Sequence, residues 1–476
     1  MDYTTVSSFI NEYAISVISL LALPAITIYA AVHAILYKRD SQAAAAWVGL
    51  IILAPIVGVI LYWLLGINRA RLRAIKIFNK TNKEAYSTNH KGIKSSALES
   101  LIAKVSATYP VRYGNEINPL LNGEQAYPEM INSIKHAKKT LVLCTYIFDN
   151  DSAGELFAKE IKEAAKRGVK CKILIDAVGA RYSFPTILRS LKGKNIHAKR
   201  FHSVLRPWSF HYAQLRNHRK LMLIDGAVGY FGGMNIRRGH LVNEARQKEI
   251  TKDIHFKAKG PILMDLMSVF ELDWYLATKE TLDETWRPKE KKAGQMSARV
   301  LPNGPDEKFD KLRWILLGAV ACAEKSISIM TPYFVPDETL ISAISVASLR
   351  GVQVNILIPR NNNHKLVGWA SMACMPQLLK TGCKVWLGGA SFDHSKLLLV
   401  DEKWCMLGSS NWDARSFRLN FELNVDSTDK VLCHNISRIF KQKLTGASRL
   451  SRDVLSAQST LSRLRNSSAR LLGPYL

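Results

Sequence analysis

An 18-residue stretch that the chain carries twice constrains its fold more than any other feature. In each copy a histidine is followed by a lysine two residues on, an aspartate seven on and an asparagine seventeen on. These positions are His218, Lys220, Asp225 and Asn235 in the first copy and His394, Lys396, Asp401 and Asn411 in the second. All four pairs are 176 residues apart. One such match is a weak motif, but two in constant register indicate a duplicated unit.

Each copy predicts a short buried strand followed by a tight turn. The apolar runs at 221–225 and 397–401 are typical of interior β-strands. Period-two geometry places the histidine and lysine of each copy on the same side of the backbone. Small residues at 232–233 and 408–409 let the backbone approach a ligand closely before the asparagine presents its amide. Imidazole, ammonium and amide groups in this layout suit a bound phosphate.

The sequence flanking each copy predicts a whole α/β domain. Strand-like, helix-like and strand-like runs follow one another at 140–148, 152–168 and 169–179, and again at 326–335, 337–351 and 352–359. The repeat period is therefore near 180 residues, too long for a solenoid unit. We expect two fused lobes, each a sheet sandwiched between helices, at 121–300 and 301–476.

The N-terminal region predicts a membrane hairpin within residues 1–68. Residues 14–37 and 43–67 carry no formal charge, and each run exceeds the roughly 20 residues that a helix needs to cross a bilayer. Two transmembrane helices joined by a tight turn would fit. Pro24 and Pro55 would also permit a hairpin that enters one leaflet and returns. The two possibilities stay open at this point.

The distribution of basic residues predicts which side of the membrane the lobes occupy. Basic residues crowd the start of the segment 69–120, which we expect to be a juxtamembrane linker; they are Arg69, Arg71, Arg73, Lys76, Lys80 and Lys83. The positive-inside rule places the two lobes on the cytoplasmic side of a multi-pass protein of the cell's inner membrane. Over the whole chain 66 basic residues face 39 acidic ones, a net charge of +27. A polyanionic partner is expected, either nucleic acid or an anionic membrane.

The doubled motif resembles the phospholipase D superfamily, and the flanking text is similar to the bacterial-type cardiolipin synthases. The likeness is carried by YIFDND at 146–151, TPYFVPDETL at 331–340, GSSNWDARSFRLNFELN at 408–424 and ARLLGPYL at 469–476. It implies two phospholipase D-like α/β/α lobes related by a pseudo-twofold axis, with one shared cleft. A homo-oligomer is left open.

Two half-sites brought together can perform chemistry that one cannot. One imidazole attacks phosphorus while the other protonates the leaving alkoxide. The near-symmetric pair does not reveal which attacks; the resemblance assigns the attack to His218 and the proton transfer to His394. Lys220, Lys396 and the two asparagines would bind the non-bridging oxygens in place of a metal, and neither a metal nor another cofactor is expected.

Carboxylates should fix the imidazole tautomers. The resemblance implies that Asp253 partners His218 and that Glu422 partners His394. Asp225 and Asp401 complete the catalytic motif, yet both fall on the opposite side of an ideal strand from the lysines. We expect them to tie loop backbone together. Five other histidines have no counterpart in the repeat and are assigned no role: His202, His211, His240, His255 and His364.

The implied reaction transfers a phosphatidyl group from one phosphatidylglycerol to another through a phosphatidyl-histidine, releasing glycerol. Water or phosphatidylethanolamine as acceptor or co-substrate would make the protein a phospholipase D or a related transphosphatidylase. A phosphodiesterase acting on nucleic acid is a further alternative that suits the net charge, but the apolar hairpin argues against it, so no nucleic-acid partner is expected. A non-catalytic scaffold is disfavoured because every polar motif position is intact in both copies.

Overall fold

The computed structural model describes residues 22–38, 41–66, 96–201, 215–304 and 310–473. The chain divides into two compact units, Met1–Leu72 and Arg73–Leu476. Each unit is described by itself below.

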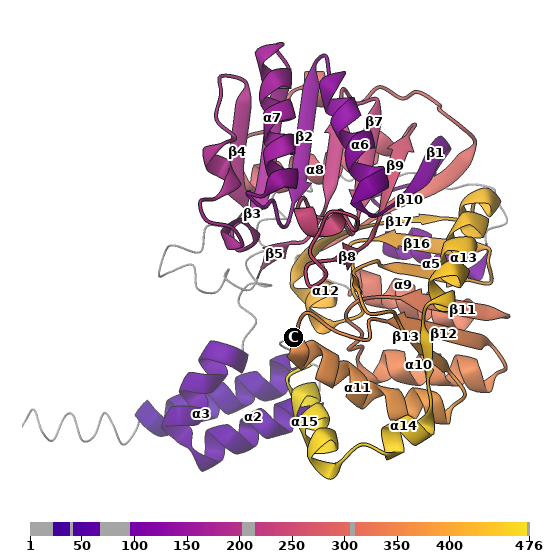
Figure 1. The fold of residues 1–476 in the computed structure, drawn as a ribbon. Helices are drawn as coiled ribbons and strands as arrows, with labels where there is room; N and C mark the ends of the chain where they lie inside the picture. The colour runs from indigo at the N-terminus through magenta and orange to yellow at the C-terminus, as the bar shows by residue number, and fades with distance from the viewer. Residues whose placement is uncertain (1–21, 39–40, 67–95, 202–214, 305–309, 474–476) are drawn as a thin grey trace, which may run out of the picture. The chain divides into compact units, whose positions relative to one another are not determined.

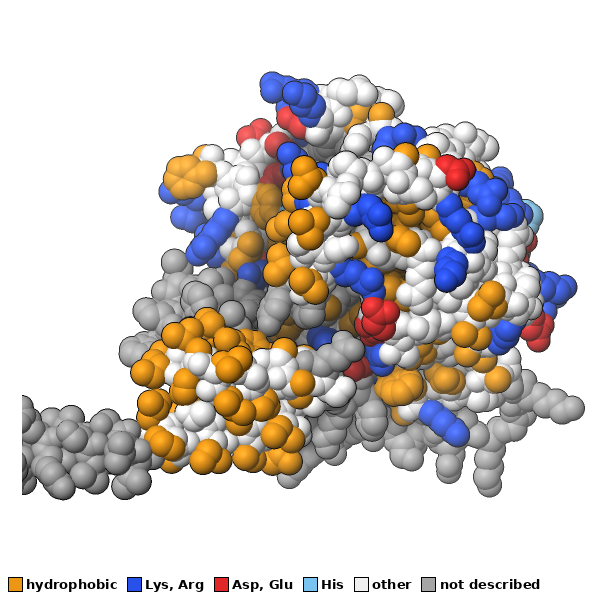
Figure 2. Space-filling view, turned by 90° about the horizontal axis from the view of Figure 1, so that it is seen from below, with side chains coloured by type: hydrophobic (Ala, Val, Ile, Leu, Met, Phe, Trp, Pro, Cys, Tyr) orange, Lys and Arg blue, Asp and Glu red, His pale blue; other side chains and the backbone are white. Residues whose placement is uncertain are grey.

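The N-terminal unit is helical and apolar on its surface. Residues 22–37 form a helix, followed by α2 (Ser41–Leu53), α3 (Pro55–Leu61) and the π-helix η1 (Tyr62–Gly66). Hydrophobic side chains crowd the surface of this unit in Figure 2, and Leu53 is 87% exposed.

The second uncharged run does not form the one long helix that the sequence predicts. A helix break at Ala54 divides residues 43–67, because the ring of Pro55 removes a backbone donor and starts a new helix. The beginning of the first run, residues 14–21, lies outside the described residues. Among the helices that the structure describes, none is both long enough and apolar enough to span a bilayer.

The second unit is built on one continuous mixed sheet. Its first half holds β1 (Arg112–Leu121), β2 (Thr140–Thr145), β3 (Lys170–Asp176), β4 (Ile196–Phe201), β6 (Leu221–Ile224), β7 (Val228–Gly232) and β9 (Ile254–Lys259). Its second half holds β10 (Met296–Asn303), β11 (Ser326–Met330), β12 (Gln353–Ile358), β13 (Lys384–Leu387), β15 (Leu397–Val400), β16 (Trp404–Gly408), β17 (Asn420–Ser427) and β18 (Ser448–Leu450).

Strand order shows the duplication directly. The sheet runs β18-β13-β12-β11-β15-β16-β17-β10-β1-β9-β7-β6-β2-β3-β4, and β1 and β10 join antiparallel at its centre. Reading outward from that junction, each half presents four antiparallel pairings and then two parallel ones, and the second half adds the antiparallel edge strand β18. The two lobes thus lie side by side in one sheet, as Figure 1 shows.

Helices cover the sheet and complete the strand–helix–strand pattern that the sequence predicts. In the first lobe they are α6 (Asn122–Lys135), α7 (Ser152–Lys166) and α8 (Ile262–Thr278); in the second they are α9 (Lys311–Cys322), α10 (Glu338–Leu349), α11 (Lys365–Lys380), α12 (Ala414–Arg418), α13 (Lys430–Thr445), α14 (Arg452–Ser456) and α15 (Thr460–Leu471). Asp151 and Asp337 cap α7 and α10 by accepting from backbone N–H groups three residues on. Each lobe has its own apolar core.

Part of the expected linker at 69–120 is ordered and belongs to the fold. Helix α5 (Ala97–Val105) begins with a capping box between Ser96 and Glu99. Its Leu98 and Ile102 enter the core of the second lobe, and β1 lies at the centre of the sheet. Residues 67–95 lie outside the described part of the chain.

Two very short pairings connect the lobes near the histidines. Strand β5 (Arg216–Asn217) runs parallel to the start of β17, and β8 (Thr251–Lys252) runs parallel to β14 (Phe392–Asp393). Each pairing joins the residues just before a histidine of one lobe to those just before an acid of the other.

Candidate active site

The structure brings His218 and His394 together in a single site. Their ring centroids are 6.3 Å apart and the rings lie nearly perpendicular, at 77°. Each histidine stands three residues before its buried strand, β6 or β15, and is about nine-tenths buried. The two halves of the repeat therefore contribute to one site, as the doubled motif predicts.

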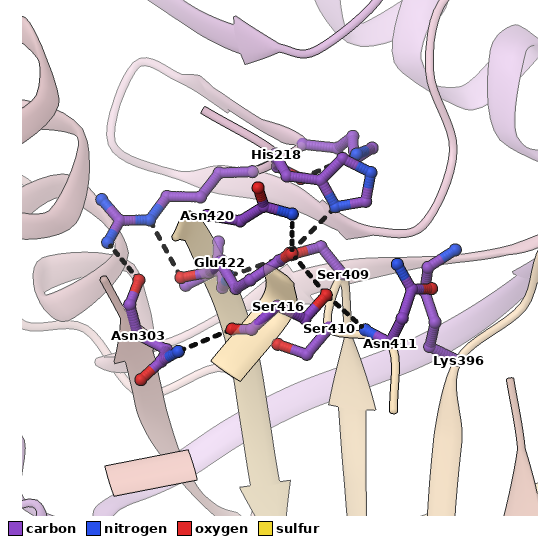
Figure 3. Close-up of polar contacts among 12 residues, drawn as sticks. His218, Asn303, Lys396, Ser409, Ser410, Asn411, Ser416, Asn420 and Glu422 are labelled. Carbon is purple, nitrogen blue, oxygen red and sulfur yellow. Dashed lines mark hydrogen bonds and ion pairs between the residues drawn. The ribbon is translucent and has the colours of Figure 1, made fainter. Parts of the chain in front are cut away.

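The carboxylate partners are exchanged relative to the sequence expectation. Glu422, not Asp253, accepts from Nδ1 of His218, at 3.0 Å, and Asp253, not Glu422, accepts from Nδ1 of His394, at 2.9 Å. Figure 3 shows the first of these contacts. The pairing that the resemblance implied is therefore wrong, although each acid does contact one of the two motif histidines.

The cross-lobe strands explain the exchange. Asn217 pairs with Phe421 in β5 and β17, so the next residues, His218 and Glu422, lie side by side. The His218 amide donates to the Phe421 carbonyl at 2.9 Å. In the other half, β14 and β8 place His394 beside Asp253 in the same way, and the His394 amide donates to the carbonyl of Lys252 at 2.7 Å. Two-residue strands carry no periodicity signal, so sequence patterns could not predict them.

Both imidazoles are held in a form suited to catalysis. An ionised carboxylate can only accept a hydrogen bond, so each Nδ1 carries the hydrogen and each Nε2 keeps a lone pair. Burial lowers the pKa of His218 and of His394 well below the ordinary value, and the charges of Lys220 and Lys396 lower both further. The charge of each lysine thus lowers the pKa of the histidine in the opposite lobe as well as the pKa of the histidine in its own lobe.

Burial raises the pKa of the two partner acids, Glu422 and Asp253, whereas it lowers the pKa of the histidines. Burial raises the pKa of Glu422 to about 7, against the positive charge of Lys220 and several hydrogen bonds. Burial also raises the pKa of Asp253, opposed by the charge of Lys396. Strongly perturbed titratable groups clustered in this way are typical of an active site.

The motif lysines are buried against their own histidines. Nζ of Lys220 donates to the carbonyl oxygen of His218 at 2.7 Å, and Lys396 makes the same bond to His394. Burial lowers the pKa of Lys220 to about 7 and that of Lys396 to about 8. A bound phosphodiester anion would favour the charged form of both, because an opposite charge nearby raises the pKa of an ammonium group.

The two asparagines are buried and differ in their bonding. The side-chain oxygen of Asn235 accepts from the Ile147 amide at 3.1 Å, which leaves the Nδ2 group as a donor. Asn411 donates its backbone N–H to the Ser416 hydroxyl at 3.1 Å, and its Oδ1 has no hydrogen-bond partner among the described residues.

The motif aspartates accept hydrogen bonds from backbone N–H groups and make no contact with the histidines. Asp225 accepts from the N–H groups of Lys138, Lys139 and Thr140, at 2.7 to 2.9 Å. Asp401 does the same for Glu324, Lys325 and Ser326, at 2.7 to 2.9 Å. This agrees with the tie that strand alternation predicts, and gives neither aspartate a contact with the reacting groups.

Further side chains surround the two acids. Glu422 accepts from the hydroxyls of Ser409 and Ser416 and from the amide of Asn420, the last two at 3.0 Å (Figure 3). In the first copy the counterpart of Ser409 is Gly233, where an added Cβ would lie 2.4 Å from Oδ1 of Asp253.

His240, to which the sequence assigned no role, is the counterpart of Ser416. It is 1% exposed, its Nδ1 donates to the Thr251 carbonyl at 2.9 Å, and its Nε2 has no partner among the described residues. Burial lowers the pKa of His240 to about 3, and the charge of Asp253 opposes this effect. A histidine that occurs in only one copy leaves no repeat signal, so nothing in the motif could have found it.

Aromatic rings wall the site. The ring of Tyr146 meets His218 edge-on at 5.3 Å, and that of Tyr333 meets His394 at 6.1 Å. Tyr333 also donates from its hydroxyl to Asn363 at 2.9 Å. Apolar walls around buried charges strengthen the electrostatic interactions inside the site.

Two family models match the lobes and the N-terminal segment. A family model described as "Cardiolipin synthase, PLD-like domain" matches residues 130–274 and 316–444, so each lobe is one such domain. A second model, "Phospholipase D-nuclease N-terminal", matches residues 25–66.

Curated relatives match over nearly the whole chain. A cardiolipin synthase from Staphylococcus aureus is 30% identical over 458 residues, covering 92% of each chain. Cardiolipin synthase 2 from Staphylococcus epidermidis is 28% identical over 468 residues, covering 94% of this chain and 96% of the relative. One from Geobacillus kaustophilus is 30% identical, covering 93% of this chain and 90% of the relative.

A solved structure shares the fold. Phosphatidylserine synthase from Haemophilus influenzae Rd KW20 superposes with a TM-score of 0.59 at 16% identity, covering 80% of this chain and all of that one. With two matching domains, a matching N-terminal segment and relatives along nearly its full length, the chain belongs to the phospholipase D-like cardiolipin synthase family.

Proposed function

We propose that this protein is a phosphatidyltransferase that makes cardiolipin from two molecules of phosphatidylglycerol. The observation that carries the proposal is the pair of buried imidazoles 6.3 Å apart, each bonded to the acid of the opposite lobe. The names of the curated relatives support the substrate class.

In the first half-reaction, Nε2 of His218 attacks the phosphorus of phosphatidylglycerol. A P–N bond forms, the P–O bond to glycerol breaks, and the departing oxygen takes a proton from His394. His394 must enter this step as an imidazolium, although burial lowers its pKa in the free site. The phosphate anion of the bound lipid and the Asp253 carboxylate both favour that charged form. The Glu422 carboxylate stabilises the charge that develops on His218 as it attacks.

In the second half-reaction, His394 is neutral and takes the proton from a hydroxyl of the second phosphatidylglycerol. That oxygen attacks the phosphatidyl-histidine, the P–N bond breaks, and cardiolipin leaves. One phosphodiester is broken and one is made, so no outside energy source enters the balance. Lys220 and Lys396 would neutralise the non-bridging oxygens throughout, aided by the Nδ2 donors of Asn235 and Asn411.

The N-terminal unit is proposed to anchor the lobes in the membrane where the lipid substrates reside. Support comes from the two uncharged runs, the apolar surface of the described helices and the match at 25–66. The basic residues after it favour the cytoplasmic side for the lobes. Whether the anchor spans both leaflets or returns from one would follow from labelling its turn from each side of the membrane.

The decisive assay follows labelled phosphatidylglycerol in nanodiscs with the purified full-length protein. Cardiolipin and free glycerol should appear together, in equal amounts. Phosphatidic acid as the main product would instead identify a hydrolase and contradict the proposal. His434→Ala, at an exposed histidine of α13, is the matched control and should keep wild-type activity.

A further inference from the structure

A basic surface lies beside the site and has no part in the reaction described above. From residue 177 to residue 201 the chain contains no aspartate or glutamate. Six cations in this stretch are exposed, and no ion pair joins any of them to an acid within the described residues: Arg181, Arg189, Lys192, Lys194, Lys199 and Arg200. We refer to residues 179–200 as the basic rim.

The basic rim also exposes large aromatic side chains. Phe184 is 89% exposed and Tyr182 is 52% exposed. The guanidinium of Arg189 lies over the Phe184 ring, 5.7 Å from its centroid. Leaving a phenyl ring in water forgoes the free energy of burying it. A lipid surface would bury these rings and pair its phosphates with the cations beside them.

A groove in the basic rim combines the same two properties. It has a volume of about 530 Å³ and runs along β4, the strand at the end of the sheet (Figure 1). Its apolar lining comes from Leu188, Leu191, Ile196 and Ala198, and its polar lining from Lys192, His197, Lys199 and Arg200. Such a groove offers an apolar floor for an acyl chain and cations for a phosphate.

The basic rim reaches the active site through two tyrosines whose rings meet edge-on. Tyr182 lies 6.3 Å from the ring of Tyr146, which in turn lies 5.3 Å from the ring of His218. An exposed side chain of the rim is therefore one aromatic ring away from a catalytic histidine. A lipid held at the rim would have its headgroup close to the reaction centre.

We propose that the basic rim is a docking surface for an anionic phospholipid bilayer, with Phe184 and Tyr182 entering the interface and the cations binding phosphate headgroups. The proposal rests on the proposed function, since it identifies where the lipid substrate approaches the lobes. Nucleic acid would use the cations but has no use for the leucine and isoleucine floor of the groove, and lipid uses both.

The depth of residue 184 in the bilayer tests the proposal without any turnover, so it can fail independently of the proposed function. Phe184→Cys carries an environment-sensitive fluorophore in a full-length Cys322→Ser background, because Cys322 is the one cysteine that is not buried. Lys159→Cys, exposed on α7, is the matched control. Both are reconstituted in nanodiscs of phosphatidylcholine with about one third phosphatidylglycerol.

The label at 184 should shift its emission to shorter wavelength and be quenched by spin labels on the acyl chains, whereas the label at 159 should do neither. Both effects should weaken in nanodiscs of pure phosphatidylcholine. A label at 184 that stays as exposed to water as the label at 159 would overturn the proposal.

A charge variant provides the second arm. Lys192→Gln/Lys199→Gln should raise the KM for phosphatidylglycerol mole fraction roughly tenfold or more with kcat retained, since each cation near an anionic surface contributes about a fivefold factor. Lys159→Gln/Lys170→Gln, which removes two exposed lysines elsewhere in the first lobe, should not. An unchanged KM in the first variant, or tight binding of a DNA duplex that only that variant loses, would contradict the lipid assignment.

Discussion

The two half-sites share a plan and differ around their acids. Glu422 sits among three side-chain donors, from Ser409, Ser416 and Asn420, which fix its carboxylate beside His218. Asp253 is one methylene shorter, faces a bare glycine, and accepts from its neighbour's backbone N–H at 2.8 Å.

This difference matches the two chemical roles. An imidazole that acts as a nucleophile must be held at one angle to phosphorus. A carboxylate that is itself fixed by several hydrogen-bond donors holds the ring in this way. A proton carrier must change its charge twice in each cycle, which a less heavily bonded carboxylate allows. The comparison therefore supports the assignment of the attack to His218 and of proton transfer to His394.

The largest expected effect comes from the histidines themselves. His218→Ala and His394→Ala should each lower transfer at least roughly 10³-fold, because each removes a group that changes bonds or protons in the transition state. A substrate with a nitrophenolate leaving group, which needs no proton, should partly restore cleavage in His394→Ala and not in His218→Ala. Steady-state assays with both substrates measure this. Equal rescue of the two variants would erase the proposed division of roles.

The acids should follow next, at roughly 10²- to 10³-fold for Glu422→Gln and Asp253→Asn, because each loses the acceptor that fixes an imidazole tautomer. A kinetic double-mutant cycle sharpens the comparison. Glu422→Gln should add little to His218→Ala, and Asp253→Asn should add little to His394→Ala. Strong coupling between Glu422 and His394 instead would show that the acids pair within each lobe.

The pH profile is the third prediction. The pKa of Glu422 is raised to about 7 and that of Lys220 is lowered to about 7, so kcat/KM should be bell-shaped with a narrow maximum near neutrality. Activity falls below it as the carboxylate is protonated and above it as the lysine loses its proton. In kcat the alkaline limb should move to higher pH, because the bound phosphate anion favours charged lysine.

Lys220→Arg checks the origin of the alkaline limb. A guanidinium stays protonated over the whole range, so any remaining limb should come from Lys396, whose pKa is lowered to about 8. A profile for this variant that falls at the same pH as the wild type would assign the limb to another group.

The smallest effects test the surroundings of the acids. Ser409→Ala removes one donor from Glu422 and should lower kcat about tenfold or less, with the acidic limb moved to higher pH because the charged carboxylate loses a stabilising bond. Gly233→Ser places a Cβ against the Asp253 carboxylate. It should therefore disturb His394, the partner of Asp253, and leave His218 unaffected. Rescue of Gly233→Ser by the activated leaving group, with no rescue of Ser409→Ala, is the expected pattern; the reverse would contradict the comparison.

Much of the fold and site could be predicted from the sequence because duplication makes the signal visible. The doubled motif placed both histidines in one site, and the strand and helix order of each lobe followed from periodicity. Strand alternation likewise separated Asp225 and Asp401 from the reacting groups.

What could not be predicted depends on tertiary contacts with no local pattern. The acids are exchanged because β5 and β8 pair across the lobes over two residues each. Helix α5 looked like linker because nine residues gain their stability from the core that they join. His240 occurs in one copy alone, so only its burial near Asp253 draws attention to it.

The most direct test is to trap and map the covalent intermediate. The full-length protein is mixed with labelled phosphatidylglycerol, quenched within one turnover, digested and analysed by mass spectrometry. The adduct should lie on His218 alone, should accumulate in Asp253→Asn and should diminish in Glu422→Gln. An adduct on His394, or one that diminishes in Asp253→Asn and accumulates in Glu422→Gln, would contradict the account.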